Sequence, residues 1–176
     1  MSDKRIILIR AVNVGGTAKL PMAELRALAE ELGATQVATY IASGNLLCAV
    51  PGHPDAFDRA LEEGIRQRFG FFREVMSRSR DELVAALEGY PFEVVEERFS
   101  YVNFLVGEPT PDAIARARLV PCGADQWQLA GREQFIQYAD GAGRAQLNSA
   151  ALAKALGVAG TARNLATVRK LIALAA

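Results

Sequence analysis

The sequence predicts an α+β fold, because short β-rich segments alternate with amphipathic helices in an order that occurs twice. The first half has the order βαββαβ, and the second half repeats the first five of these elements. This order defines the split βαβ, or ferredoxin-like, unit. We therefore expect two tandem ferredoxin-like subdomains, residues 1–79 and residues 80–176, of which the second carries a C-terminal helix.

The first element is a strand at residues 5–12. Its nearly continuous apolar run is typical of a central strand that is buried on both faces. A helix follows at residues 21–32, where apolar residues recur every three or four positions and Gly33 comes directly after the last turn. These two elements place residues 13–20 in a connecting loop that is longer than most strand-to-helix connections.

The remaining elements of the first half form a hairpin, a helix and a strand. Residues 36–41 and 46–50 are β-rich and are joined by a turn that contains Gly44 and Asn45. The next helix begins near Pro54 and closes at Gly70, and a strand is expected at residues 72–76. The boundary between the subdomains should fall near Ser79.

The second half repeats this pattern in its elements but not in its residues. We expect the following segments: a helix at 81–87, a strand at 101–106, a helix at 111–118, a hairpin at 126–130 and 134–138, and helices at 148–156 and 165–174. No closing strand is predicted after the helix at 148–156. The terminal helix takes its place, so the second subdomain reads as βαββα with an extra helix.

Two compact polar loops, RAVNVGG at residues 10–16 and YIASGN at residues 40–45, are the best candidate site. In a βαββαβ unit the first and second strands point the same way, and the first and third are neighbours. The loop after the first strand therefore lies beside the turn between the second and third. Because Gly-Gly lets backbone N–H groups face a ligand and a helix N-terminus follows, these loops are suited to an anion or a carbonyl group.

The candidate ligand-binding residues of these loops supply backbone or side-chain donors. They are Arg10, Asn13, Gly15, Gly16, Lys19, Tyr40, Ser43, Gly44 and Asn45. The alternative is that Gly15–Gly16 merely allows the chain to turn, while Asn13 and Asn45 bond to backbone groups nearby.

Two further candidates lie in the last quarter of the chain. Arg144 ends the Gly-rich stretch DGAGR, which could be a backbone nest or an ordinary turn. Arg163 and Asn164 precede the terminal helix. Thr161 or Asn164 is a suitable cap, whereas Arg163 stands where the helix dipole favours an anion. A bound anion or an acidic side chain from elsewhere would resolve that conflict.

Charge is unevenly distributed although the formal net charge is zero. Residues 141–176 carry five basic side chains and no acidic one, which leaves 15 of the 20 basic and all 20 acidic residues in the first 140. This asymmetry suggests an anionic partner for the C-terminal segment. The alternative is that the basic segment packs on the acidic stretch at residues 82–97.

Several classes of protein find no support in the sequence. Neither Gly-rich stretch matches GxxxxGK[ST] or GxGxxG, so no P-loop or dinucleotide-binding motif is present. Cys48 and Cys122 lack metal-ligand spacing and are expected to be reduced thiols in a cytoplasmic protein. His53, the sole histidine, precedes a helix and is expected to be a cap or a surface residue. We expect no metal, no organic cofactor and no membrane segment, and no catalytic residue can be named.

The motifs RAVNVGG, MAELRALAEELG, TYIASGN, RFGF, DGAGRAQL and GTARNLATVRKL together resemble a bacterial family, domain of unknown function 1697. The resemblance runs from about residue 6 to residue 174 and implies two tandem ferredoxin-like subdomains without an established activity. It adds Gly143 to the candidate residues above. Ala11, Ala42 and Leu165 stand where the family commonly has glycine, glutamine and tryptophan.

Three functions are consistent with these patterns. The first is a binding module for an anionic ligand, such as a nucleotide, a phosphorylated metabolite or a nucleic acid, at residues 10–19 and 40–45. The second is a cofactor-independent enzyme that uses the same cleft. The third is a structural or interaction protein that pairs through sheet edges or the basic segment.

Overall fold

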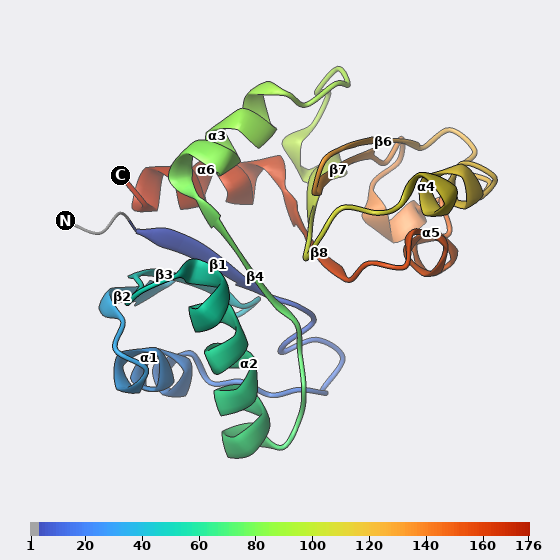
Figure 1. The fold of residues 1–176 in the computed structure, drawn as a ribbon. Helices are drawn as coiled ribbons and strands as arrows, with labels where there is room; N and C mark the ends of the chain where they lie inside the picture. Colours follow the sequence, from blue (N-terminus) through green and yellow to red (C-terminus); the bar gives the residue numbers. More distant parts are fainter. Residues whose placement is uncertain (1–3) are drawn as a thin grey trace. The chain divides into compact units, whose positions relative to one another are not determined.

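The computed structural model describes residues 4–176, so residues 1–3 of the expected first subdomain lie outside the described part. The chain divides into two compact units. One contains the described residues up to Val84 together with Lys170–Ala176, and the other contains Ala85–Arg169. Each unit holds one four-stranded sheet (Figure 1).

The first unit contains the expected βαββαβ order. Its elements are β1 (Arg5–Ile9), α1 (Met22–Glu31), β2 (Thr35–Thr39), β3 (Asn45–Ala49), α2 (Pro54–Phe69), β4 (Val75–Ser79) and the beginning of α3 (Arg80–Glu88). The sheet order is β2-β3-β1-β4, and β1 pairs antiparallel with both β3 and β4. This is the ferredoxin-like arrangement predicted from the sequence.

The core of the first unit lies between this sheet and two helices. α1 and α2 lie side by side on one face of the sheet (Figure 1). Leu25 of α1 and Leu61 of α2 pack there with Ile7 of β1 and Leu46 of β3. Ile6 is buried as well, so β1 is covered on both faces, as its continuous apolar run predicts.

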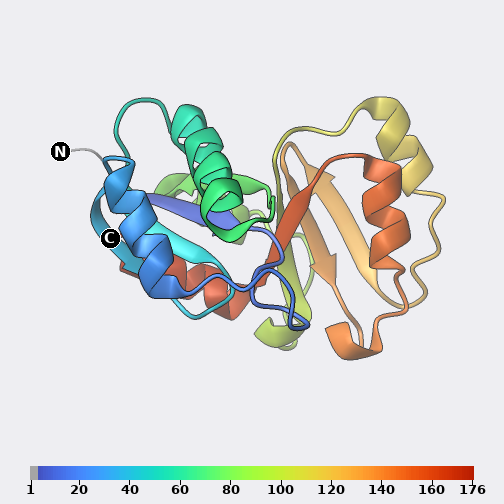
Figure 2. The same ribbon diagram turned by 90° about the horizontal axis from the view of Figure 1, so that it is seen from below.

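The second unit has the same topology as the first. Its elements are η1 (Glu97–Phe99), β5 (Ser100–Leu105), α4 (Pro111–Ala117), β6 (Gln126–Ala130), β7 (Glu133–Gln137), η2 (Ala142–Arg144), α5 (Ser149–Leu156), β8 (Gly160–Asn164) and most of α6 (Leu165–Leu174). The sheet order is β6-β7-β5-β8, and α4 and α5 lie side by side (Figure 2). Two similar ferredoxin-like units in tandem therefore form the chain.

One element was missed by the sequence prediction and another was misplaced. β8 is the closing strand that the sequence did not reveal, and it pairs antiparallel with β5, Val102 opposite Arg163. The strand expected at residues 72–76 is instead formed by Val75–Ser79. Phe72 precedes it and is half exposed, so its aromatic ring does not mark a strand.

The helices that follow β4 and β8 begin in related ways. Ser79 and Glu82 form a reciprocal capping box, in which the Glu82 N–H donates to Ser79 Oγ at 3.1 Å and the Ser79 N–H donates to Glu82 Oε2 at 2.7 Å. At α6 the Thr167 N–H donates to Asn164 Oδ1 at 2.9 Å, which confirms Asn164 as a cap. The tandem repeat therefore includes one helix after each βαββαβ unit.

Candidate functional site

The loop after β1 and the turn before β3 lie at the same end of the first sheet. Leu8 is opposite Asn45 in the antiparallel register, and the Ile9 N–H donates to the Gly44 carbonyl at 2.9 Å. These pairings join the first residues of the loop directly to the turn. The adjacency inferred from the topology is thus present in the structure.

Asn13 holds the loop in place through its side-chain amide. Its Nδ2 donates to the Leu20 carbonyl at 2.9 Å and to the Ala42 carbonyl at 2.7 Å, and its Oδ1 accepts from the Leu20 N–H at 2.8 Å. One side chain thus closes the loop on itself and fastens it to the neighbouring turn. Asn13 therefore bonds to nearby backbone groups, which is the alternative to ligand binding given above. These bonds use both of its amide N–H groups.

The turn at residues 40–45 is likewise stabilised by the hydrogen bonds of a buried asparagine side chain. Asn45 is fully buried, and its Nδ2 donates to the Tyr40 carbonyl at 3.0 Å and to Ser43 Oγ at 3.1 Å. Gly44 has φ 84°, and a Cβ there would lie 2.8 Å from Val12 Cγ2 and 2.9 Å from the Ile9 carbonyl oxygen. Glycine is thus required at position 44 for close packing, and Asn45 supports the turn from within.

Arg10 supplies charge at the loop but has an acidic partner. Its guanidinium lies 3.3 Å from Glu74 Oε2, and the two side chains are 44% and 28% exposed. Glu74 immediately precedes β4, and its carbonyl accepts from the Arg10 N–H at 3.1 Å. Glu74 gives no signal in the sequence as a site residue, because only the pairing of β1 with β4 brings it to this end of the sheet.

The donors that remain free belong to Gly15, Gly16 and Lys19. Within residues 4–176 neither the N–H groups of the two glycines nor the ammonium of Lys19 has a hydrogen-bonding partner. Gly15 and Gly16 have φ values of 62° and 74°, and a Cβ at either position would meet no atom within 4 Å. The space above this turn is therefore open.

Residues with strained backbone conformations are concentrated in the same two loops. Five non-glycine residues among those described have positive φ: Ala11, Asn13, Ala18, Gln36 and Ile41. All except Gln36 lie in the loop after β1 or in the turn before β3, with φ between 49° and 55°. Such conformations are unfavourable for alanine and especially for a β-branched residue, and they concentrate at binding and catalytic sites.

The candidate residues Arg144, Arg163 and Asn164 belong to the second unit, whereas the two loops of the candidate site belong to the first. Arg144 is exposed at the end of η2, where its N–H closes a turn on the Gly141 carbonyl at 3.0 Å. Arg163 lies in β8 and is buried, and its Nη1 donates to Thr161 Oγ1 at 2.6 Å. Burial lowers the pKa of the Arg163 guanidinium to about 10. Its position in a strand replaces the helix-terminal position expected from the sequence.

Arg169 of the basic C-terminal segment contacts the acidic stretch considered above. The Arg169 Nε donates to Glu97 Oε1 at 2.5 Å, and both side chains are partly exposed. Lys154 and Lys170 are exposed. The packing alternative thus accounts for Arg169.

A second polar cluster, not anticipated from the sequence, covers the edge of β4. The N–H groups of Val75 and Ser77 donate to Glu62 Oε1 at 2.9 Å and to Asp58 Oδ2 at 3.0 Å. Both carboxyl groups belong to buried residues of α2, and burial raises the pKa of each. These contacts occupy edge donors that could otherwise pair with another strand.

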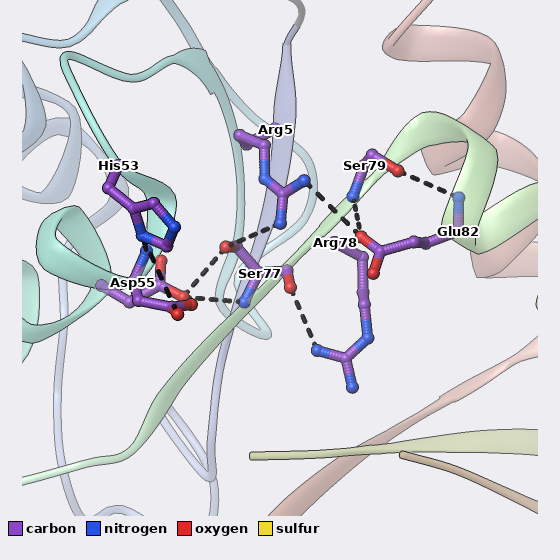
Figure 3. Close-up of polar contacts among 8 residues, drawn as sticks. Arg5, His53, Asp55, Ser77, Arg78, Ser79 and Glu82 are labelled. Carbon is purple, nitrogen blue, oxygen red and sulfur yellow. Dashed lines mark hydrogen bonds and ion pairs between the residues drawn. The ribbon is translucent and has the colours of Figure 1, made fainter. Parts of the chain in front are cut away.

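Arg5 connects this cluster to the start of α3. Figure 3 shows its guanidinium between Ser77 and Glu82, 3.3 Å from Ser77 Oγ and 3.5 Å from Glu82 Oε2. His53 also appears there, and its Nδ1 accepts from the Asp55 N–H at 3.2 Å. His53 is therefore the N-cap of α2, which confirms the prediction of a cap.

Residues 4–176 contain no group of three or more His, Cys, Asp or Glu side chains that could hold a metal ion. None of the helices described in this range is long and apolar enough to cross a membrane.

Sequence comparison identifies the family. The sequence model described as protein of unknown function DUF1697 matches residues 2–135, which is more than half of the chain. The chain belongs to the DUF1697 family. The matched range contains both loops of the candidate site, whereas the motifs at residues 140–147 and 160–171 lie beyond it.

A solved structure has the same fold over nearly the whole length. It is that of a conserved bacterial protein from Streptococcus pneumoniae, with 21% sequence identity, a TM-score of 0.74 and coverage of 99% of each chain. No curated protein matches the sequence. Membership of DUF1697 therefore indicates a fold but no established activity.

Proposed function

We propose that this DUF1697 protein is a cytosolic binding module for an anionic ligand, held by the loop at residues 10–19 beside the turn at residues 40–45. The ligand classes that suit these loops are nucleotides, phosphorylated metabolites and nucleic-acid segments. The observation that carries the proposal is the open Gly15–Gly16 turn with free N–H groups and the unpaired ammonium of Lys19 nearby in sequence. Both cysteines are free thiols, which suits a reducing compartment.

The chemistry of this turn suits an anion better than a cation. Gly15 and Gly16 both have left-handed φ values, and successive backbone N–H groups in such turns can form a concave set of donors. An oxygen of a phosphate or carboxylate accepts from several N–H groups at once, and these charge-assisted bonds are stronger than neutral ones. Lys19 adds a full positive charge within the same loop.

The bonding of Asn13 gives the loop the rigidity that a receptor needs. Because its side chain fixes both Leu20 and Ala42, the loop is ordered before any ligand arrives. A preordered loop loses little conformational entropy on binding. The positive φ values of Ala11, Ala18 and Ile41 indicate that the shape of these loops is maintained at an energetic cost of about 1–3 kcal/mol per residue.

The residues therefore have different roles in the proposed site. Gly15, Gly16 and Lys19 contact the anion, and Arg10, which is partly neutralised by Glu74, adds to the positive field. Asn13, Gly44 and Asn45 maintain the shape of the loops. Asn13 and Asn45, which the sequence suggested as ligand-binding residues, are thus assigned to the support of the loops.

The test is a thermal-shift screen of the full chain with nucleotides, inorganic phosphate, phosphorylated sugars and short oligonucleotides. A ligand that binds the folded state raises the unfolding temperature with concentration. We expect at least one anionic class to do so, and we expect Lys19→Gln to weaken the shift. Lys154→Gln, which removes an exposed lysine of α5, is the matched control and should leave the shift unchanged.

A second pair of variants separates charge from backbone strain. Gly16→Asp and Gly16→Asn place side chains of equal size at a left-handed position that both residues tolerate. Only the aspartate brings a negative charge to the open turn. Loss of the ligand-induced shift in Gly16→Asp but not in Gly16→Asn supports the proposal. Equal shifts in both variants, or no stabilisation by any member of the screen, would refute it.

A further inference from the structure

A groove of about 450 Å³ lies in the second unit, which does not contain the loops discussed above. Its walls come from the segment before η1, the end of α4 and the start of β6. The residues used in the following argument are Phe92, Arg118, Val120, Cys122, Asp125 and Trp127. The groove thus combines two aromatic rings, a cation and a thiol.

Trp127 forms an aromatic surface in this groove. It is half-buried on the edge strand β6 and packs against the core of the second unit. The guanidinium of Arg118, the C-cap residue of α4, lies 5.7 Å from the centroid of the indole ring. A cation over an indole face is stabilised by the electrons of the ring, so this contact holds Arg118 beside the groove.

Arg118 carries a charge that no carboxylate balances locally. It is exposed, and no ion pair or hydrogen bond to its side chain occurs within residues 4–176. An arginine in this situation keeps its planar set of N–H donors available for an anion. The contact with Trp127 therefore positions a free guanidinium next to an aromatic surface.

Asp125, the acidic residue of the groove, is occupied elsewhere. It is 2% exposed, and its two oxygens accept from the N–H groups of Ala139, Gln146 and Leu147 at 2.9, 2.6 and 2.8 Å. These bonds make Asp125 the anchor of the connection between β7 and α5. Three backbone donors satisfy its carboxylate, so the cationic group of the groove remains without a partner.

We propose that this groove binds a small planar aromatic ligand that carries a negatively charged group. The ring packs against Trp127 and Phe92, and the anionic group bonds to Arg118. The volume of 450 Å³ lies within the usual range of small-molecule sites. The ring and the charge are both required, because Trp127 and Phe92 recognise the ring whereas Arg118 recognises the charge.

Two natural reporters lie inside the groove. Trp127 is the only tryptophan in the chain, so intrinsic indole fluorescence reports on this groove alone. Cys122 is half-buried whereas Cys48 is fully buried, so alkylation of the folded protein reports on Cys122. A ligand in the groove should change the fluorescence saturably and slow the alkylation of Cys122 over the same range of concentration.

The experiment titrates the full chain with adenosine monophosphate and, separately, with benzoate, an aromatic carboxylate that does not absorb at the excitation wavelength used. Adenosine supplies the ring without the charge, and ribose phosphate supplies the charge without the ring. Fluorescence is excited at the red edge of the indole absorption, where adenine does not absorb. We expect at least one of the two aromatic anions to bind, and we expect adenosine and ribose phosphate to bind at least tenfold more weakly than adenosine monophosphate if that anion is the ligand.

Arg118→Gln tests the role of the guanidinium, and Arg116→Gln is the matched control on the same helix. Arg116 is exposed and does not line the groove. We expect Arg118→Gln to weaken binding about tenfold and Arg116→Gln to leave it unchanged, with both reporters in agreement. Absence of a saturable response to both aromatic anions, equal binding by adenosine and adenosine monophosphate, or equal effects of the two variants would overturn the proposal. Because Lys19 and Gly16 lie in the other unit, their variants leave this response intact, so the two proposals fail independently.

Discussion

The side-chain amide of Asn13 donates to the carbonyl of Ala42 at 2.7 Å. This bond joins the loop after β1 to the turn before β3, two segments that neighbour each other only because β1 and β3 pair. The same amide oxygen accepts from the Leu20 N–H at 2.8 Å. Asn13 therefore controls the shape of the loop that presents Gly15, Gly16 and Lys19.

The role of Asn13 can be separated from its backbone conformation by two substitutions. Asn13→Gly removes the three side-chain hydrogen bonds but tolerates φ 55°, and we expect it to lower the free energy of unfolding by about 1–2 kcal/mol. Asn13→Ala should lower it by about 1 kcal/mol more, because alanine is unfavourable in a left-handed conformation. Urea unfolding measures both values. Wild-type stability in Asn13→Gly would show that these bonds contribute nothing.

Gly44 and Gly15 provide a second comparison. Both have positive φ, 84° and 62°, but only at Gly44 would a Cβ meet other atoms, the closest at 2.8 Å. We expect Gly15→Ala to lower the free energy of unfolding by about 1 kcal/mol through backbone strain. Gly44→Ala should add about 1–3 kcal/mol from overpacking against Val12 and Ile9. Equal losses in the two variants, measured by urea unfolding, would contradict the close packing of Gly44.

We expect the stability of the protein to depend on pH through the buried carboxyl group of Asp58. Burial raises its pKa above the ordinary value of 3.8, so the folded state binds the proton more tightly than the unfolded state does. The contribution of Asp58 to stability is therefore most favourable at low pH, and it declines as the pH rises from the unfolded pKa through the higher folded pKa. Asp58→Asn lacks this titration.

The measurement is the free energy of unfolding of wild type minus that of Asp58→Asn, followed from neutral to mildly acidic pH. We expect this difference to shift in favour of the wild type as the pH falls. Asp55→Asn removes an exposed carboxylate from the same helix and is the matched control. A difference that shifts in favour of Asp58→Asn on acidification would show that the carboxylate is stabilised, not destabilised, by its buried position.

The fold could be predicted from the sequence where local pattern and burial agree. β1 is a continuous apolar run, and α2 has a clear apolar stripe between His53 and Gly70, so both were located from the sequence. β1 nevertheless ends at Ile9 and not at Val12 as expected, because Ala11 has the positive φ of a turn. β8 was missed because Gly160–Asn164 has low strand propensity, and its pairing with β5 is a contact far apart in sequence. A buried arginine in that strand, Arg163, also gives no apolar signal.

The candidate site shows the same limit. The sequence indicated which two loops meet, because strand order alone determines that. It could not indicate that Asn13 and Asn45 point into the protein, since the direction of a side chain depends on φ and on partners such as Ala42 that are distant in the chain. The pairing of Arg10 with Glu74 was hidden for the same reason, because it depends on β1 and β4 being neighbours.

The most direct test of the proposed anion site is an amide proton–nitrogen correlation spectrum recorded during titration with inorganic phosphate and then with adenosine monophosphate. We expect the resonances of Gly15 and Gly16 to move together and saturably with at least one of these anions. We also expect Gly16→Asp to abolish the movement of Gly15 and Gly16→Asn to retain it. If Gly15 and Gly16 stay unmoved at saturating concentrations of both anions, or if Gly16→Asp binds as tightly as Gly16→Asn, the loop after β1 is not an anion receptor.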